Sequence, residues 1–237
     1  MARSGVDLAA LGLAWARAMP AVVIVPAFGL RAFPTAARAV LGLALAATVF
    51  PALAPIHVAG GGTWPLLALG QMALGLPVAI AAAVPLWAAT MAGGVADALR
   101  GGNAQGTPSA PTVEGGATPL GVPLSILASG IFLATGGPAR VAMALARTTL
   151  EGHPALAAAG DLTAGIALAV ALAGPLLAAS VVIEVSGALI ARAASPTQLH
   201  LLLAPLRALG LLVVLGLSLE RMAIVLASAV ERAPLQL

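Results

Sequence analysis

The chain contains no cysteine and no lysine, and only 8% of its 237 residues are charged. Without cysteine there is no disulfide, no thiol chemistry and no redox compartment to infer. An ordinary soluble domain carries about 25% charged residues, whereas this chain is 61% hydrophobic with a mean hydropathy of +1.07. The composition therefore excludes a soluble globular domain and indicates a protein that crosses a membrane several times.

Groups suited to catalysis or metal binding are sparse and scattered. The three histidines, His57, His153 and His200, lie far apart and lack the spacing of metal ligands. The eight acidic residues are dispersed, and no phosphate-cradling glycine loop or nucleophile–base pattern occurs. We expect no enzyme activity, no metal and no cofactor. The eleven basic residues are all arginine and form no run, so we expect no nucleic-acid partner.

Six apolar segments follow one another along the chain, and proline or glycine interrupts most of them. The longer ones match the roughly 20 residues that cross about 30 Å of hydrocarbon, and their many small residues let helices approach closely. We predict an all-α membrane protein of about six kinked apolar helices arranged as helical hairpins. The segments are residues 8–30, 39–50, 66–92, 123–150, 162–191 and 199–230, the fourth being two short helices that meet at residues 136–138.

Three of these segments carry features that bear on function. The first is interpreted as a retained span rather than a removed signal peptide, and its Arg17 either meets an acid on a partner or snorkels. Pro77 and Pro85 are expected to break the third segment. Glu184 is the lone acid of the fifth segment, a functional hypothesis by default. Contact with another subunit, a proton-coupled step and simple hydration all stay open for it.

Residues 93–121 form the one long stretch that cannot lie in lipid, because it is rich in glycine and proline and carries Asp97, Arg100 and Glu114. Loops of this length are usually functional or disordered, and we interpret this one as functional. An ordinary solvent loop is the alternative. Asp97 and Arg100 lie three positions apart, so they are neighbours if a helix continues that far. They then either fix the base of the loop against other subunits or form an exposed ion pair.

Arginines set the expected orientation. Arg31, Arg38, Arg100, Arg192 and Arg207 flank the first, third and fifth loops between segments. The positive-inside rule then places these loops in the cytoplasm and both ends of the six-segment array outside.

Several stretches resemble one family of type III export-apparatus subunits, called FliR in flagella and SctT in injectisomes. They are Arg31-x-x-Pro34-x-x-x-Arg38, Gly93-Gly94-x-x-Asp97-x-x-Arg100-Gly101, and the stretch from Gly187 to Arg192 followed by Pro196, Gln198 and Pro205-Leu206-Arg207. The order of the six apolar segments matches as well. The central stretch is closer to the injectisome branch. One departure is Thr197, which moves the hinge proline one residue further from Arg192 than is usual.

The resemblance implies a structural and gating subunit of the export gate in the bacterial inner membrane, which helps form and close the channel for unfolded secretion substrates. It implies several copies of FliP/SctR-like and FliQ/SctS-like partners and an FlhB/SctU-like subunit. It also implies a division into residues 1–92, a plug-like central loop 93–122, a broken helix pair 123–160 and a FliQ-like hairpin 161–237. The tip of that hairpin would face the cytoplasm.

The resemblance also assigns roles to two sets of residues. The gate or plug loop would use Asp97, Arg100, Gly101, Gly102, Pro108, Pro111, Glu114, Gly115 and Gly116. Hinges and subunit contacts would use Arg31, Pro34, Arg38, Glu184, Arg192, Pro196, Gln198, Pro205 and Arg207.

Two other classes of function compete with this interpretation. A small-solute secondary transporter would need polar residues at the midplane and internal repeats, and the chain shows neither clearly. An intramembrane enzyme would need clustered acids or histidines. Co-purification with two other small membrane subunits would discriminate these classes, because a transporter would run alone or as a homo-oligomer.

Overall fold

The computed structural model describes residues 8–28, 34–52, 62–99, 118, 120–148, 154–193 and 199–233. Within these ranges every regular element is a helix, so the all-α prediction is confirmed. The elements are α1 (Leu8–Ile24), α2 (Thr35–Val49), the short 3₁₀ helix η1 (Phe50–Ala52), α3 (Trp64–Leu99), α4 (Gly121–Ala134), α5 (Gly137–Arg147), α6 (Pro154–Ala193) and α7 (Leu199–Arg232).

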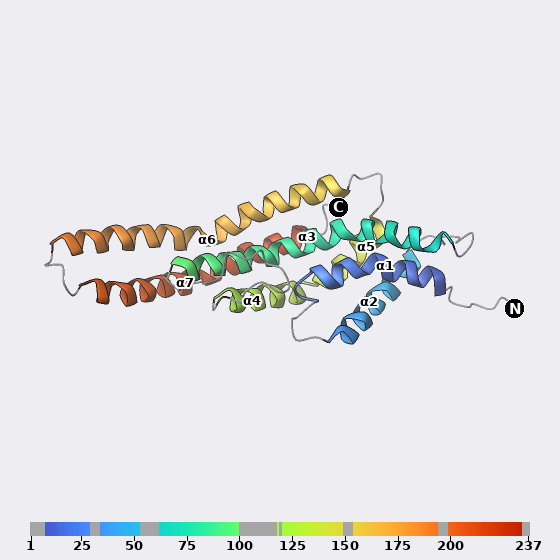
Figure 1. Cartoon of the computed structure of the whole chain (residues 1–237), viewed down its shortest axis with the longest axis horizontal. Helices are drawn as coiled ribbons and strands as arrows, with labels where there is room; N and C mark the ends of the chain where they lie inside the picture. Colours follow the sequence, from blue (N-terminus) through green and yellow to red (C-terminus); the bar gives the residue numbers. More distant parts are fainter. Residues whose placement is uncertain are drawn as a thin grey trace.

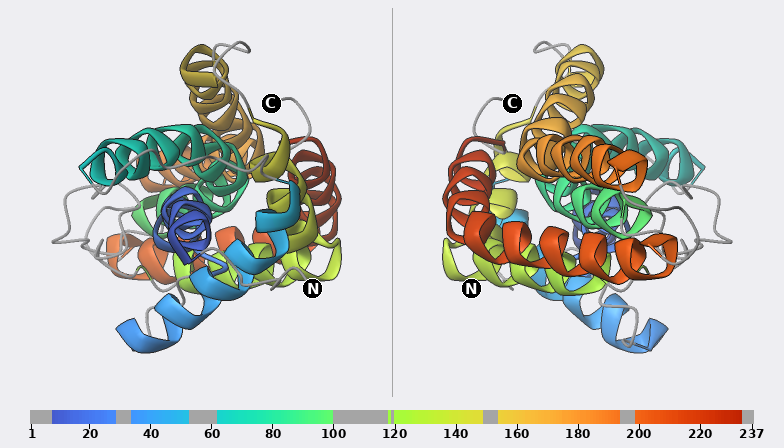
Figure 2. Two further views of the ribbon diagram at one scale, coloured as in Figure 1. Left: turned by 90° about the vertical axis from the view of Figure 1, so that its right-hand side faces the viewer. Right: turned by 90° about the vertical axis from the view of Figure 1, so that its left-hand side faces the viewer.

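The helices form an elongated bundle with α3 running through its middle (Figure 1). Helix α3 contacts α1, α4, α5, α6 and α7. Helices α6 and α7 form a long hairpin that extends beyond the other helices at one end (Figure 1). In the end-on views α2 projects from one side of the bundle and the first half of α6 from the opposite side (Figure 2). One central helix therefore joins the short N-terminal helices to the long hairpin.

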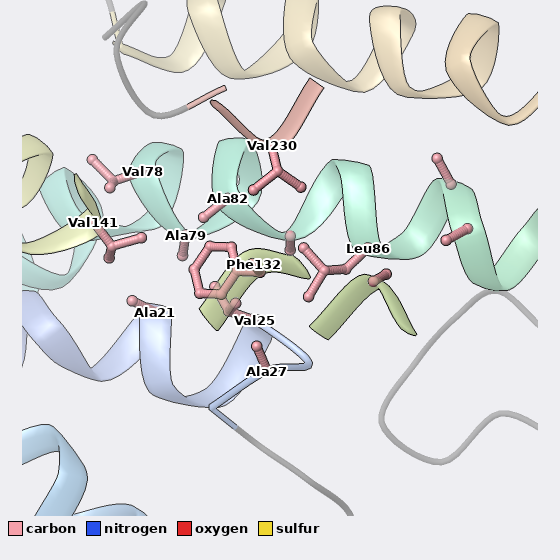
Figure 3. Packing of buried hydrophobic residues seen from close by; sticks show 14 of the residues in the cluster. Ala21, Val25, Ala27, Val78, Ala79, Ala82, Leu86, Phe132, Val141 and Val230 are labelled. Carbon is pink, nitrogen blue, oxygen red and sulfur yellow. The ribbon is translucent and has the colours of Figure 1, made fainter. Parts of the chain in front are cut away.

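The core is centred on α3 and takes residues from α1, α2, α4, α5, α6 and α7 as well (Figure 3). Phe132 of α4 is 1% exposed and packs edge to face on Phe28, with ring centroids 5.7 Å apart and an interplanar angle of 81°. Leu86 of α3 and Val141 of α5 are fully buried beside it. Much of the remaining core is alanine. Such small side chains let the helix backbones approach closely, and a β-carbon at Gly75 of α3 would overlap the carbonyl oxygen of Arg17 in α1.

Helix α1 is shorter than predicted. Residues 8–30 were expected to form one crossing, but α1 has 17 residues and ends at Ile24. Pro26 follows two residues later, and a proline lacks the N–H that would continue the ladder. Among the described residues, α3 and the stretches 156–193 and 205–232 are long and apolar enough to cross a membrane, and α4 with α5 makes a fourth, broken candidate.

Helix α3 is longer than predicted, and the expectations about its internal breaks and about where it ends are wrong. Pro77 and Pro85 lie inside one continuous helix of 36 residues and do not end it. The helix also continues through Gly93 and Gly94 to Leu99, so the first part of the predicted central loop, Asp97 included, is helical. In its most apolar stretch 44% of α3 residues are buried, against 22% for α6 and 17% for α7. Packing on several sides of α3 offsets the unfavourable propensities of proline and glycine.

The start of α6 and the break between α4 and α5 can also be compared with the sequence-based prediction. Helix α6 begins at Pro154 rather than at residue 162, which makes it 40 residues long, and Pro175 lies within it. Figure 1 shows α6 bent near its middle. The break expected at residues 136–138 is confirmed, since α4 and α5 meet at 68°. Gly136 between them has φ of 74°, a left-handed conformation that glycine adopts without steric cost.

Candidate functional site

The base of the central segment is built by the end of α3 and the start of α4. Asp97 lies in the last turn of α3, and its side chain is buried with the residue only 5% exposed. Its Oδ2 atom accepts a hydrogen bond of 2.7 Å from the backbone N–H of Leu120, the N-cap residue of α4. The Oγ1 atom of Thr118 accepts a second bond, of 3.0 Å, from the N–H of Gly121. The chain therefore leaves α3 and enters α4 at one place.

Two glycines make this close approach possible. A β-carbon on Gly93 would lie 2.6 Å from Cα and 2.7 Å from N of Gly121, and 2.8 Å from the carbonyl oxygen of Leu120. All three atoms belong to the backbone, so no side-chain rotation could relieve the overlap. A β-carbon on Gly94, one residue further on, would meet nothing within 4 Å. The need for glycine at position 93 is thus set by α4, and not by the conformation of α3.

The expected Asp97–Arg100 pair cannot be followed, because Arg100 lies outside the described residues. The Oδ2 atom of Asp97 bonds α4, which fixes the base of the loop within the chain. The other predicted plug residues also lie outside the described part of the chain: Gly101, Gly102, Pro108, Pro111, Glu114, Gly115 and Gly116.

The structure brings together two of the predicted hinge residues in the α6–α7 hairpin. Arg207 Nη2 lies 2.5 Å from Glu184 Oε1, with the two side chains 31% and 53% exposed. This geometry gives Glu184 a role that is not among the three left open by the sequence, namely an ion pair within the hairpin. Arg192 is exposed in the last turn of α6, and Pro205 is exposed within α7. Pro196 and Gln198 fall outside the described ranges.

The first predicted hinge is seen only in part. Pro34 is exposed and is the N-cap of α2, where its carbonyl accepts the N–H groups of Ala37 at 2.9 Å and Arg38 at 3.3 Å. Arg38 is half-buried in the first turn of that helix. Arg31 is not among the described residues. An open apolar groove of about 420 Å³ lies beside this turn, lined by Leu8, Leu11, Gly12, Trp15, Ala39, Val40 and Leu43.

Arg17 has a role that neither sequence interpretation contained. It is 4% exposed, and its Nη2 atom donates a hydrogen bond to the carbonyl oxygen of Thr148, the C-cap residue of α5. The alternative that Arg17 snorkels is therefore wrong, and its observed partner is a carbonyl of the same chain. Contact with an acid on a partner subunit stays a prediction. Arg17 and Thr148 are 131 positions apart, and the sequence between them carries no pattern that would have revealed this contact.

No catalytic or metal-binding arrangement emerges in the described part of the chain. Within those ranges there is no group of three or more His, Asp or Glu side chains that could hold a metal ion. Most of the side-chain hydrogen bonds found there join a Ser, Thr or Arg side chain to a carbonyl of its own helix. Those of Asp97 and Arg17 join different helices, and the chemistry they support is positioning of the backbone.

Comparison with known families gives a match over nearly the whole chain. The family model described as "Bacterial export proteins, family 1" matches residues 8–233, which include all the helices named above. No curated protein matches the chain.

Proposed function

Because the chain belongs to the FliR/SctT family of bacterial export proteins and is a membrane subunit of a type III export apparatus, we propose that it helps to form and to close the channel through which unfolded proteins leave the cell. The observation that carries this proposal is the family match over residues 8–233. The proposed role is structural and gating, with no catalysed reaction. The site of action is the bacterial inner membrane.

The closing role is assigned to residues 100–117, the part of the predicted plug-like loop 93–122 that lies beyond the end of α3 and before Thr118. This segment is rich in glycine and proline, which suit tight non-helical backbone with small side chains. Such backbone is tolerated at membrane depth only against protein or a water-filled cavity. The buried contacts between Asp97 and Leu120 and between Gly93 and Gly121 support the proposal, because they hold both ends of the segment at one point of the bundle.

The proposal includes partner subunits, and the length of α6 supports it. Large apolar side chains are exposed along α6 from Leu156, 76% exposed, to Ile190, 52% exposed. These 34 residue steps, at 1.5 Å each, correspond to roughly 51 Å of helix, against about 30 Å of hydrocarbon. A tilt of about 40° would still leave a height of roughly 39 Å. Lipid alone therefore leaves part of this apolar strip uncovered, and a protein neighbour would cover the rest.

The membrane export complex that we propose contains several copies of FliP/SctR-like and FliQ/SctS-like subunits and an FlhB/SctU-like subunit. Arg192, Pro196, Gln198, Pro205 and Arg207 would lie at or near the cytoplasmic tip of the α6–α7 hairpin, as the arginine distribution predicts. Arg31, Pro34 and Arg38 would form a second contact region. Membership of the injectisome branch stays a prediction from the pattern Gly93–Gly101.

Deletion of residues 102–116 tests the closing role. The complex carrying this deletion, reconstituted in liposomes, should release a trapped small dye, whereas the complex with the full chain should retain it. Deletion of residues 234–237 serves as a control for chain shortening and should leave the vesicles sealed. Dye retention by a correctly assembled complex that lacks residues 102–116 would refute the plug.

Purification tests the partner proposal separately. The chain extracted in mild detergent should carry two other small membrane subunits, each in several copies. A chain that purifies alone or as a homo-oligomer would instead support the small-solute transporter.

A further inference from the structure

The bent α4–α5 pair receives a side-chain contact at each of its two outer ends from another helix. At the start of α4 the N-cap residue is Leu120, whose side chain has no group that could cap the helix. Asp97 of α3 accepts a hydrogen bond of 2.7 Å from the N–H of Leu120 itself. This bond is the one that the acidic residue of a capping box makes to the N-cap N–H, but here the acid comes from a different helix.

The other outer end is the C-terminus of α5. There the buried guanidinium of Arg17, from α1, donates to the carbonyl of Thr148. The signs of the two groups are opposite and match the helix ends they meet. A carboxylate lies at the positive N-terminal end of α4, and a guanidinium at the negative C-terminal end of α5.

The joint between the two helices is short and bent. Only Thr135 and Gly136 separate α4 from α5, and the axes turn by 68°. At this joint Arg140 Nη2 donates a 2.9 Å hydrogen bond to Thr135 Oγ1. The outer ends of α4 and α5 lie furthest from this joint, so contacts at these ends constrain the positions of the two helices most strongly.

We propose that Asp97 and Arg17 are positioning residues that hold the bent α4–α5 pair at its two outer ends. Asp97 fixes the point at which the chain enters α4, and Arg17 fixes the end of α5 against α1. The consequence for channel closure rests on the proposed function, but the positioning itself does not. Loss of either group frees its own end of the pair and leaves the other end in place.

Spin-label distances in the full-length chain within its complex test this proposal. The chain has no native cysteine, so introduced cysteines are the only labelling sites on this chain. One label pair, at Ala98→Cys and Val122→Cys, reports the start of α4, where both native side chains are exposed. A second pair, at Val23→Cys and Met143→Cys, reports α5 against α1, and both of these native side chains are 45% exposed.

Each variant should disturb one pair only. Asp97→Ala should abolish the single narrow distance peak of the 98–122 pair and leave the 23–143 peak unchanged, whereas Arg17→Met should do the reverse. Asp97→Asn, whose amide oxygen can still accept from Leu120, should restore the 98–122 peak. Glu220→Ala removes an exposed acid from α7 and serves as the control, with both peaks retained.

Two results would overturn the proposal. A narrow 98–122 peak in Asp97→Ala would show that this carboxylate does not position α4. Broadening of both label pairs by either variant would show a general loss of packing rather than two separate anchors. The distances do not depend on dye release, so sealed vesicles after deletion of residues 102–116 would refute the proposed plug without touching this inference.

Discussion

Replacing Gly93 by alanine gives the sharpest test of the contact between α3 and α4. The added β-carbon would lie 2.6 Å from Cα of Gly121, and ordinary contacts of this kind begin at 3.4 Å. The two helices must therefore separate by about 0.8 Å at this point. The Asp97–Leu120 hydrogen bond, now 2.7 Å long, would stretch to about 3.5 Å, beyond the usual 3.2 Å limit.

Three terms combine in the expected loss of unfolding free energy of Gly93→Ala. Overpacking against backbone costs about 1–3 kcal/mol, and loss of a hydrogen bond to a charged group costs about 1.5–3 kcal/mol. Alanine in place of glycine stabilises a helix by about 1 kcal/mol. The net loss is about 3 kcal/mol, which for a chain of this size lowers the melting temperature by roughly 6–12 °C.

Gly94→Ala is the matched control, because it is the next residue of the same helix and a β-carbon there meets nothing within 4 Å. It should keep or slightly raise the melting temperature through its better helix propensity. Thermal unfolding of the detergent-solubilised protein measures both variants. Equal melting temperatures for the two alanine variants would refute the reasoning, since the contact with Gly121 would then impose no constraint.

Three further substitutions probe the joint and the hairpin. Gly136→Ala should lower the unfolding free energy by about 1–2 kcal/mol, because the residue has a left-handed conformation with φ of 74°. Gly130→Ala, at an open position of α4, is the control. Equal melting temperatures for these two variants would contradict the prediction. Glu184→Gln and Arg207→Gln should each cost less than about 1 kcal/mol, because their ion pair is partly exposed. Loss of co-purifying partners in Glu184→Gln but not in Arg207→Gln would show that Glu184 serves a neighbouring subunit instead.

Local features of the sequence were enough to predict most of the fold. Apolar composition predicted an all-helical membrane protein, and Gly136-Gly137-Pro138 predicted the break between α4 and α5. The arginine and glycine patterns led to the FliR/SctT family, which the family match confirms. These predictions succeed because helix breaking, turn conformation and lipid solubility depend on residues close together in the chain.

The same local rules failed for α3. Two prolines were expected to break the helix internally and a Gly-Gly pair to begin the central loop, yet the helix continues from Trp64 to Leu99. A propensity cost of about 1 kcal/mol for glycine and about 3 kcal/mol for proline is outweighed when a helix is packed on several sides. The amount of packing is a property of the whole bundle.

The sequence by itself determined that this protein is a helical membrane subunit of a bacterial export apparatus, and roughly where its helices lie. Only the tertiary structure decided the partners of the buried polar groups. Asp97 bonds Leu120, 23 residues away, and Arg17 bonds Thr148, 131 residues away. A buried polar group must find a partner. Which partner it finds depends on how distant helices cross, and no spacing along the chain records that.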